Sequence, residues 1–264
     1  MKKIAALLMA LVMLCVCVSC ASSSDAEYIE EKGTFIIGIT YYEPMNYLDG
    51  GELTGFETEF AKKVCEKLGL TPVFQEINWE TKEIELAGKT IDCIWNGMTI
   101  TPKRLETMSI STAYMSNKQV LVVKKENLDK YTDAASFSKA KLVAEAESAG
   151  ETVAKENSLF AEAEYTAVDS MKTAIMEVAA GTADACVVDY VTSIGMIGEG
   201  TSYSGLAVDG DFAFDEETYG IAFRKGSDMT EKVNAVIAEL LSSGYLETLA
   251  EKYKLEDQII KAAE

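Results

Sequence analysis

Short apolar runs and amphipathic stretches alternate along almost the whole chain. The apolar runs are rich in valine, isoleucine and aromatic residues, as buried strands are. The stretches between them carry apolar residues at the spacing of one helix face. This alternation predicts an α/β fold with largely parallel sheets. The runs assigned as strands are Thr34–Thr40, Thr71–Ile77, Ile91–Trp95, Gln119–Val123, Lys141–Ala144, Ala183–Val188 and Tyr219–Phe223.

The helical pattern is clearest between Phe56 and Leu68, where apolar residues recur every four positions. A capping box formed by Thr54 and Glu57 is predicted to begin this helix, and Gly69 is predicted to end it. A helix with this spacing buries one apolar face against its neighbours.

Two further regions follow the same helical pattern. Residues 169–180 place apolar residues on one face, and Gly181 follows them as a stop signal. Residues 233–249 have the same periodicity on both sides of Gly244, which predicts a terminal pair of helices.

No proline-rich linker divides the chain, which contains only three prolines. If the strands and helices form two lobes, the connections between the lobes must therefore be extended strands. We place one connection near Met115–Lys118 and the other near Asp211–Thr218.

The first residues have the pattern of an export signal. Lys2 and Lys3 precede an apolar run, Ile4–Val18, that is shorter than the roughly 20 residues of a membrane-spanning helix. Residues 1–19 are therefore predicted to be a signal peptide.

The end of this signal, Cys17-Val18-Ser19-Cys20, resembles a bacterial lipobox. The resemblance implies that signal peptidase II cuts before Cys20 and that this cysteine receives diacylglycerol, although leucine is usual where Cys17 stands. A redox Cys-x-x-Cys motif is the alternative, but no βαβ pattern surrounds it. Under the lipobox interpretation, residues 20–28 would be the lipidated cysteine and a polar tether. The protein is thus expected on the outer face of the cell membrane, held by lipid alone, or in the periplasm if the cell has an outer membrane.

Composition and charge exclude several classes of function. The formal net charge is −19, which argues against binding to nucleic acid or to anionic lipid head groups. The chain has no histidine, so Ser-His-Asp and Cys-His catalysis and histidine metal sites are excluded. Residues 209–220 begin like an EF-hand loop, but Phe214 stands where glycine is required and Gly220 where the bidentate glutamate belongs. No metal or cofactor is expected.

Three cysteines follow the predicted anchor. Cys65 lies in a predicted amphipathic helix, and Cys93 and Cys186 lie in apolar strands. Their odd number and their positions favour small buried side chains over a disulfide framework.

Polar and aromatic residues stand at the ends of four predicted strands, where a buried core would not place them. The first strand runs into residues 41–44, and the third into residues 95–99 with Arg104 shortly beyond. Residues 147–150 follow a later strand and open a helix, and Asp189 ends another apolar strand. In open α/β sheets, ligands bind beyond the carboxyl ends of the strands, where helix N-termini and backbone amides also point.

Taken singly, each of these side chains has an ordinary structural role open to it. An aspartate that ends an apolar strand needs a partner or water, or it caps the following helix. The corresponding roles are a surface aromatic for Tyr42, a core aromatic for Trp95, an ion pair with Glu106 for Arg104 and a helix cap for Ser148.

Together, however, these residues supply the groups that bind a zwitterion. The guanidinium of Arg104 can bind a carboxylate through two hydrogen bonds, and amides at a helix start add further donors. Asp189 can accept hydrogen bonds from an ammonium group, and an aromatic ring can cover the carbon between the two charged groups. The set therefore predicts an α-amino acid ligand.

Several stretches of the chain have an order and spacing typical of one family. They are Gly33-Thr34, Tyr42-x-Pro44-Met45, LTGFETEFAKKVCEKLG (53–69), IDCIWNGMTITPKR (91–104), GTADACVVD (181–189) and YGIAFRKG (219–226). In these stretches the sequence resembles the extracytoplasmic amino-acid-binding proteins of ABC importers, known as bacterial solute-binding protein family 3. The resemblance extends roughly from Gly33 to Tyr253.

The resemblance implies a bilobed periplasmic-binding-protein-like fold of type II. Two α/β lobes joined by two crossover strands would clasp the ligand between them. Lobe 1 would comprise residues 29–116 and 216–264, and lobe 2 would comprise residues 117–215.

Family roles carry over to the matching positions of this chain. Arg104, Thr99 and the amide of Gly97 would bind the ligand carboxylate, and Ser148 with the amides after it would contribute from lobe 2. Asp189 would bind the ammonium group. The residues expected at the ligand are Tyr42, which would stack on it, Asn96, Gly97, Thr99, Arg104, Ser148, Ala149 and Asp189. Those expected to influence selectivity are Glu43, Lys82, Trp95 and Met98.

Several positions depart from the usual family pattern. Glu43 and Met45 stand where proline and phenylalanine are common, and Ile39 replaces a common acidic residue. Lys82 replaces a common apolar residue, and Glu147 stands where glycine is common. Glu43 would favour a cationic ligand and Lys82 an anionic one, so the class of ligand side chain stays open.

The predicted function is that of a receptor that closes on one free, polar or charged α-amino acid and presents it to the permease and ATPase of an ABC importer. Closure would be driven by a ligand that bridges both lobes, and the protein is expected to act as a monomer. No catalysis is expected. The alternatives are a dehydratase-like enzyme on the same scaffold, whose acid-base group would be Glu43, and a sensory ectodomain.

Overall fold

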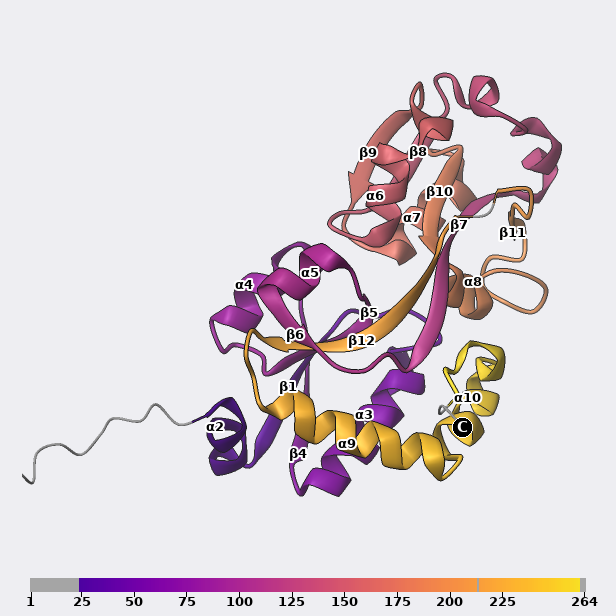
Figure 1. Cartoon of the computed structure of the whole chain (residues 1–264). Coiled ribbons are helices and arrows are strands. Elements are labelled where there is room, and N and C mark those ends of the chain that lie inside the picture. The colour runs from indigo at the N-terminus through magenta and orange to yellow at the C-terminus, as the bar shows by residue number, and fades with distance from the viewer. Residues whose placement is uncertain (1–23, 213, 262–264) are drawn as a thin grey trace, which may run out of the picture.

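The computed structural model describes residues 24–212 and 214–261. The predicted signal peptide, Cys20 and residues 21–23 lie outside these residues. The rest of the predicted tether is helical instead, because Ser24 caps a helix that begins at Asp25 and buries Ala26 against lobe 1. Two groups of strands and helices, joined by a pair of long strands, make up the described chain (Figure 1). This mixed α/β, bilobed arrangement confirms the fold that the sequence predicts.

The strands follow one another along the chain with helices between most of them. They are β1 (Thr34–Ile39), β2 (Tyr47–Asp49), β3 (Glu52–Thr54), β4 (Thr71–Glu76), β5 (Cys93–Thr99), β6 (Met108–Ile110), β7 (Met115–Lys124), β8 (Lys141–Glu145), β9 (Glu164–Val168), β10 (Ala185–Asp189), β11 (Leu206–Val208) and β12 (Glu216–Arg224). Their hydrogen-bonded order in the main sheet is β4-β1-β5-β12-β7-β10-β8-β9, with β6 on β12 and β11 on β7. β1 is parallel to β4 and β5, and β8 is parallel to β9 and β10, as expected for an α/β fold.

Strands β7 and β12 connect the two groups (Figure 1). Their first residues pair antiparallel with each other, with Met115 opposite Tyr219 and Lys118 opposite Glu216. Further along, β12 pairs with β5, whereas β7 pairs with β10. We call the group around β4, β1 and β5 lobe 1 and the group around β10, β8 and β9 lobe 2. The residue boundaries given above for the lobes stay a proposal.

The helices cover the faces of the sheet in both lobes (Figure 1). They are α2 (Asp25–Lys32), α3 (Phe56–Leu68), α4 (Lys82–Ala87), α5 (Pro102–Thr107), α6 (Ala149–Glu156), α7 (Met171–Ala180), α8 (Tyr190–Met196), α9 (Met229–Ser242) and α10 (Tyr245–Tyr253), with 3₁₀ helices at Trp79–Thr81, Lys125–Lys130, Ala134–Phe137, Ser158–Phe160 and Glu256–Gln258. The predicted stop signals are correct, since Gly69 ends α3, Gly181 ends α7 and Gly244 separates α9 from α10. Within the described ranges, no helix is long and apolar enough to cross a membrane.

The predicted capping box at the start of α3 is wrong. Gly55 is the N-cap, and Thr54 makes no cap hydrogen bond; its hydroxyl instead lies 3.1 Å from the hydroxyl of Tyr253. Only glycine fits at position 55, because its φ is 120° and a Cβ there would lie 2.2 Å from the carbonyl oxygen of Met45. Glu57 does not take part in a cap. Its side chain is buried in lobe 1, where it accepts hydrogen bonds from Asn46 and from the N–H of Gly97.

Each lobe has its own hydrophobic core. In lobe 1, the ring of Phe60 on α3 meets Trp95 and Tyr114 edge-on, with centroid separations of 4.9 and 5.4 Å. In lobe 2, buried residues pack on both faces of the sheet, against α7 on one face and around Phe137 on the other. The three cysteines predicted to lie in the core are buried and free: Cys65, Cys93 and Cys186.

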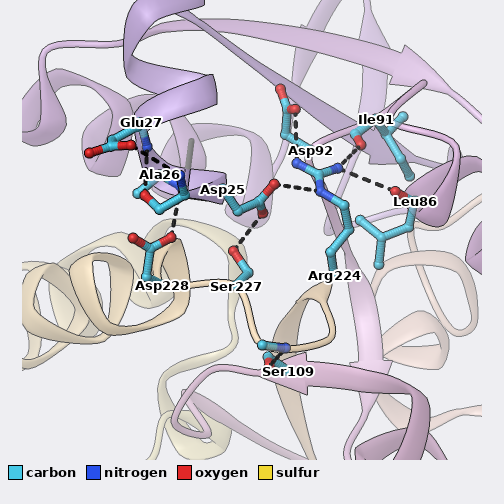
Figure 2. Close-up of polar contacts among 12 residues, drawn as sticks. Asp25, Ala26, Glu27, Leu86, Ile91, Asp92, Ser109, Arg224, Ser227 and Asp228 are labelled. Carbon is cyan, nitrogen blue, oxygen red and sulfur yellow. Dashed lines mark hydrogen bonds and ion pairs between the residues drawn. The ribbon is translucent and has the colours of Figure 1, made fainter. Parts of the chain in front are cut away.

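A buried ionic network centred on Arg224 ties the N-terminal helix to lobe 1 (Figure 2). The Nε atom of Arg224 donates to Asp25 at 2.7 Å, and Nη2 donates to Asp92 at 3.3 Å. Nη1 donates to the backbone carbonyls of Ile91 and Leu86 at 2.7 and 3.2 Å. The side chain of Asp92 has no exposed surface, so its charge depends on these partners and on Lys32.

The same network joins the start of α2 to the start of α9 (Figure 2). The hydroxyl of Ser227 donates to Asp25 at 2.6 Å, and Asp228 accepts the backbone N–H of Ala26 at 2.8 Å. Helix α2 is thus held to lobe 1 from two directions.

We expect Arg224→Met to lower the free energy of unfolding by about 3 kcal/mol, because it leaves the buried carboxylate of Asp92 with one cation fewer. Lys225→Met, at the next and exposed position, is the matched control and should change stability by less than about 0.5 kcal/mol. Urea denaturation measures both. Equal effects of the two substitutions would show that the network contributes nothing to stability.

Candidate ligand-binding site

Arg104 lies in lobe 1 on the short helix α5 and faces lobe 2. The sequence Thr101-Pro102-Lys103-Arg104 forms this helix because Thr101 caps it, accepting the N–H of Arg104 at 3.2 Å, and Pro102 occupies its first position. The guanidinium Nη1 donates to the carbonyl of Thr99 at 2.9 Å, and Nη2 donates across the lobes to the carbonyl of Glu147 at 3.2 Å. Burial lowers the pKa of Arg104, but a guanidinium stays charged.

Asp189 ends β10 in lobe 2 and is 5% exposed. Its carboxylate accepts a hydrogen bond from the hydroxyl of Tyr219 at 2.7 Å and another from the amide of Gln119. These two donors lie on β12 and β7, the strands that connect the lobes. Asp189 stands at the N-cap of α8, but its side chain makes no cap hydrogen bond, so a capping role for it is wrong. Burial raises the pKa of Asp189.

Glu217 on β12 is a second, half-buried acid near Asp189, and the sequence did not single it out. Its Oε1 accepts hydrogen bonds from Gln119 at 2.8 Å, from Thr99 at 3.3 Å and from Asn117. Burial, with Asp189 nearby, raises the pKa of Glu217 to about 7. The strand predicted from sequence begins only at Tyr219. Glu217 therefore fell in the segment predicted to connect the lobes, where its partners could not be foreseen.

The loop between β8 and α6 brings lobe 2 against Arg104. Glu147 has a left-handed φ of 57°, and its carbonyl accepts hydrogen bonds from both Arg104 and Lys82. Ser148 caps α6 by accepting the N–H of Glu151 at 3.0 Å, so its hydroxyl has the structural role that was the alternative to ligand binding. Ala149 is the first residue of α6, whose leading N–H groups have no intrahelical partner.

Lys82 is buried in the same region, with 3% of its surface exposed. Its ammonium donates to the carbonyls of Trp79 at 2.9 Å and Glu147 at 3.4 Å and lies 4.5 Å from the centroid of the Trp79 ring. Burial, with Arg104 nearby, lowers the pKa of Lys82 to about 8. A cavity of about 200 Å³ opens between Lys82 and Arg104 on one side and Glu147, Ser148 and Ala149 on the other.

The side chain of Asn96 and the amide of Gly97 make hydrogen bonds within lobe 1, and their contact with a ligand stays a prediction. The side chain of Asn96 accepts the N–H of Thr40 at 2.8 Å and donates to its hydroxyl at 2.6 Å. The amide N–H of Gly97 donates to Glu57 at 2.8 Å. Glu57 lies in the first turn of α3, and burial raises its pKa to about 7. Both residues therefore shape the corner after β5 from inside the lobe.

Trp95 and Met98 lie in the core of lobe 1, and their influence on selectivity stays a prediction. Both side chains are fully buried, because β5 is central in lobe 1 and is covered on both faces. Glu43 is exposed and lines a separate cavity of about 320 Å³, which also includes Tyr41 and Tyr203.

Tyr42 packs tightly against the corner that Gly97 forms. Its side chain is buried, and burial raises the pKa of its hydroxyl, which has no hydrogen-bond partner among the described residues. Gly97 has a φ of 57°, and a Cβ at this position would lie 2.2 Å from that hydroxyl. Stacking of Tyr42 on a ligand stays a prediction.

Two α/β lobes that share a pair of crossover strands and bring opposite charges together at their junction define a bilobed solute-binding protein. The family model for bacterial extracellular solute-binding proteins, family 3, matches residues 35–256. The chain therefore belongs to this family.

Two curated relatives are similar over most of their length. The L-cystine-binding protein TcyJ of Escherichia coli (strain K12) is 29% identical over 228 residues, which cover 85% of this chain and 84% of that protein. The arginine-binding extracellular protein ArtP of Bacillus subtilis (strain 168) is 27% identical over 257 residues, covering 96% of this chain and 98% of that protein.

Solved structures show the same fold. An ancestral arginine-binding protein bound to arginine superimposes with a TM-score of 0.76 at 28% identity, covering 84% of this chain and 98% of that one. The ancestral amino acid-binding protein AncCDT-1, described as a precursor of cyclohexadienyl dehydratase, has a TM-score of 0.76 at 29% identity, covering 88% and 99%.

We expect Gly97→Ala to destabilise lobe 1 by about 1–3 kcal/mol, because the new methyl group meets the Tyr42 hydroxyl. Tyr42→Phe alone should change stability by less than about 1 kcal/mol, since the hydroxyl it removes has no partner. The double variant should recover part of the loss in urea denaturation. Strict additivity of the two substitutions would rule out the contact.

Proposed function

We propose that this protein binds one polar or charged α-amino acid between its lobes as the receptor of an ABC importer. Arg104 binds the ligand carboxylate, and Asp189 binds the ammonium group. The observation that carries this proposal is the hydrogen bond from Arg104 of lobe 1 to the Glu147 carbonyl of lobe 2, beside the buried carboxylate of Asp189. The cystine- and arginine-binding relatives support the ligand class.

The donors of Arg104 suit a carboxylate better than the group they meet here. Nη1 is fixed by the carbonyl of Thr99, which orients the guanidinium plane, while Nη2 reaches only a neutral carbonyl in Glu147. A ligand carboxylate that replaced this carbonyl would form charge-assisted hydrogen bonds, which are roughly twice as strong as neutral ones. Ligand binding would therefore preserve the contact between the lobes and strengthen it.

Asp189 is the complementary group, a buried carboxylate without a cationic partner among the described residues. Tyr219 and Gln119 hold its carboxylate in place, but both donors are neutral and no cation forms an ion pair with it within the described ranges. An ammonium group would supply the missing positive charge and offset the burial that raises the pKa of Asp189. Neither lobe alone satisfies both ends of a zwitterion, so an amino acid favours the closed arrangement of the lobes. A micromolar dissociation constant corresponds to about −8 kcal/mol, which these contacts can supply after ordering costs.

The family and the N-terminal sequence support a place outside the cytoplasm. We propose that diacylglycerol on Cys20 holds the protein at the outer face of the membrane, where it delivers its ligand as a monomer to a permease driven by an ATPase. The curated relatives are named as binding proteins, and we propose binding without catalysis. Glu43, which an enzyme would need as its acid-base group, is exposed.

Arg104→Ala is expected to weaken binding of every amino acid at least about 100-fold, because it removes the only lobe 1 cation assigned to the carboxylate. Lys125→Ala, an exposed cation away from the junction of the lobes, is the control and should leave affinity unchanged. Calorimetric titration with the twenty amino acids, ornithine, citrulline and cystine measures the effect. Affinity near that of the wild type would refute the role of Arg104.

Asp189→Asn should weaken amino acids far more than their deaminated analogues, since only the former carry the ammonium group that the carboxylate binds. The same titration, run with each amino acid and its 2-hydroxy acid, gives the two losses. Equal losses would contradict the role of Asp189.

Mass spectrometry of the membrane fraction should find diacylglycerol on Cys20 as the first residue of the processed chain. Cys20→Ser should release the protein from the membrane without changing its affinity for ligand, because it changes none of the residues assigned to the ligand. An unmodified chain that is secreted freely in the wild type would disprove the lipid anchor.

A further inference from the structure

Glu145 ends β8 at the junction of the lobes and is 2% exposed. Its carboxyl group accepts no hydrogen bond and forms no ion pair among the residues that the structure describes. The neighbouring acids that are buried or half-buried differ from it. Glu57, Asp189 and Glu217 each accept hydrogen bonds from at least two donors.

A buried carboxyl group without donors is costly unless it stays neutral or meets a cation. Burial, with Asp189 on the neighbouring strand, raises the pKa of Glu145 to about 8. The group is therefore mainly protonated at neutral pH when no ligand is bound. A side chain that served packing alone would not need a carboxyl group here.

The charged groups with the largest effect on Glu145 come from both lobes, and the hydroxyl of Tyr42 also lies near it. Asp189 faces it from β10 and Asp169 from the turn before α7, and both disfavour a second negative charge. Lys82 and Arg104 face it from lobe 1, on α4 and α5. Neither cation forms an ion pair with Glu145, because both direct their donors to backbone carbonyls, including that of Glu147. The carboxyl group of Glu145 thus keeps its full capacity for a ligand.

We propose that Glu145 determines the class of ligand by accepting a hydrogen bond from a side chain that ends in a cation, an ammonium or a guanidinium group. This inference rests on the proposed amino-acid-binding function and adds the charge of the ligand side chain to it. Glu145 was not among the residues that the sequence singled out for the site.

The balance of charge at the junction agrees with a cationic ligand. Three acids, Asp189, Glu145 and Glu217, face two cations, Arg104 and Lys82. The carboxylate and ammonium of an amino acid add no net charge, so ionisation of all three acids would leave one negative charge uncompensated. A cationic side chain compensates it, a neutral one leaves Glu145 protonated and unpaired, and an anionic one adds a further repulsion.

This arrangement also predicts that a proton leaves when ligand binds. The pKa of Glu145 is about 8 without ligand, and a cation beside the carboxylate lowers it. At pH 7 the group changes from protonated to ionised, so a proton is released. Affinity for a cationic ligand should therefore rise with pH toward 8 and fall below pH 7, where protonation of Glu145 opposes binding.

Arginine and citrulline give the sharpest test, because they have nearly the same shape and differ in side-chain charge. We expect the wild type to bind arginine at least about 10-fold more tightly than citrulline. Glu145→Gln should lower arginine affinity by roughly 10- to 100-fold, leave citrulline affinity unchanged and reduce the proton release seen by titration in buffers of different ionisation enthalpy. Glu164→Gln, an exposed acid on β9, is the matched control and should behave as the wild type.

Lys82→Met provides a second test that does not depend on the folding of the Glu145 variant. Removing this positive charge should raise the affinity for arginine relative to citrulline several-fold by relieving repulsion, whereas loss of the Lys82 contact with the Glu147 carbonyl should affect both ligands alike. An unchanged or lower ratio would overturn the inference. Wild-type protein that binds citrulline or glutamate as tightly as arginine would also overturn it but leave the proposed function intact. Failure to bind any amino acid would refute the proposed function itself.

Discussion

The antiparallel pairing of β7 with β12 is the contact on which the rest of the structure depends. It joins the two sheets and also brings together residues that are about 100 positions apart in sequence. Gln119 and Tyr219, one from each strand, hold the carboxylate of Asp189, and Gln119 also binds Glu217. The junction of the lobes is therefore fixed in the same place as the polar groups that face a ligand. Movement of one lobe relative to the other therefore changes the positions of these polar groups relative to one another.

Acids outnumber cations at this junction, and burial raises the pKa of Glu217 to about 7 and that of Glu145 to about 8. Such an arrangement stabilises the empty protein poorly and the loaded protein well, because a ligand supplies charges that the chain lacks. In a binding protein, a buried polar group that has no partner within the chain thus indicates which complementary group the ligand carries. The fully satisfied carboxylate of Glu57, in contrast, maintains the corner after β5.

Much of the fold could be predicted from sequence, because it depends on local signals. Alternating strands and helices indicated the α/β class, and Gly69, Gly181 and Gly244 marked helix ends correctly. The order of strands and helices also placed Arg104 and Asp189 at the junction of the lobes, whereas their roles toward a ligand stay a prediction. The remaining features of the candidate site depend on distant pairing. Glu217 gains its partners from the register of β7 with β12, and the amide of Gly97 is taken by Glu57, 40 positions earlier.

The ionic network of Arg224 fixes α2 to lobe 1, and Ser24, the first described residue, caps that helix. An attachment upstream of Ser24 would therefore load one lobe and leave the other unrestrained. Lobe 1 would then be the lobe held near the membrane. Lobe 2 could move relative to lobe 1, so opening and closing would not require the attached lobe to change its position.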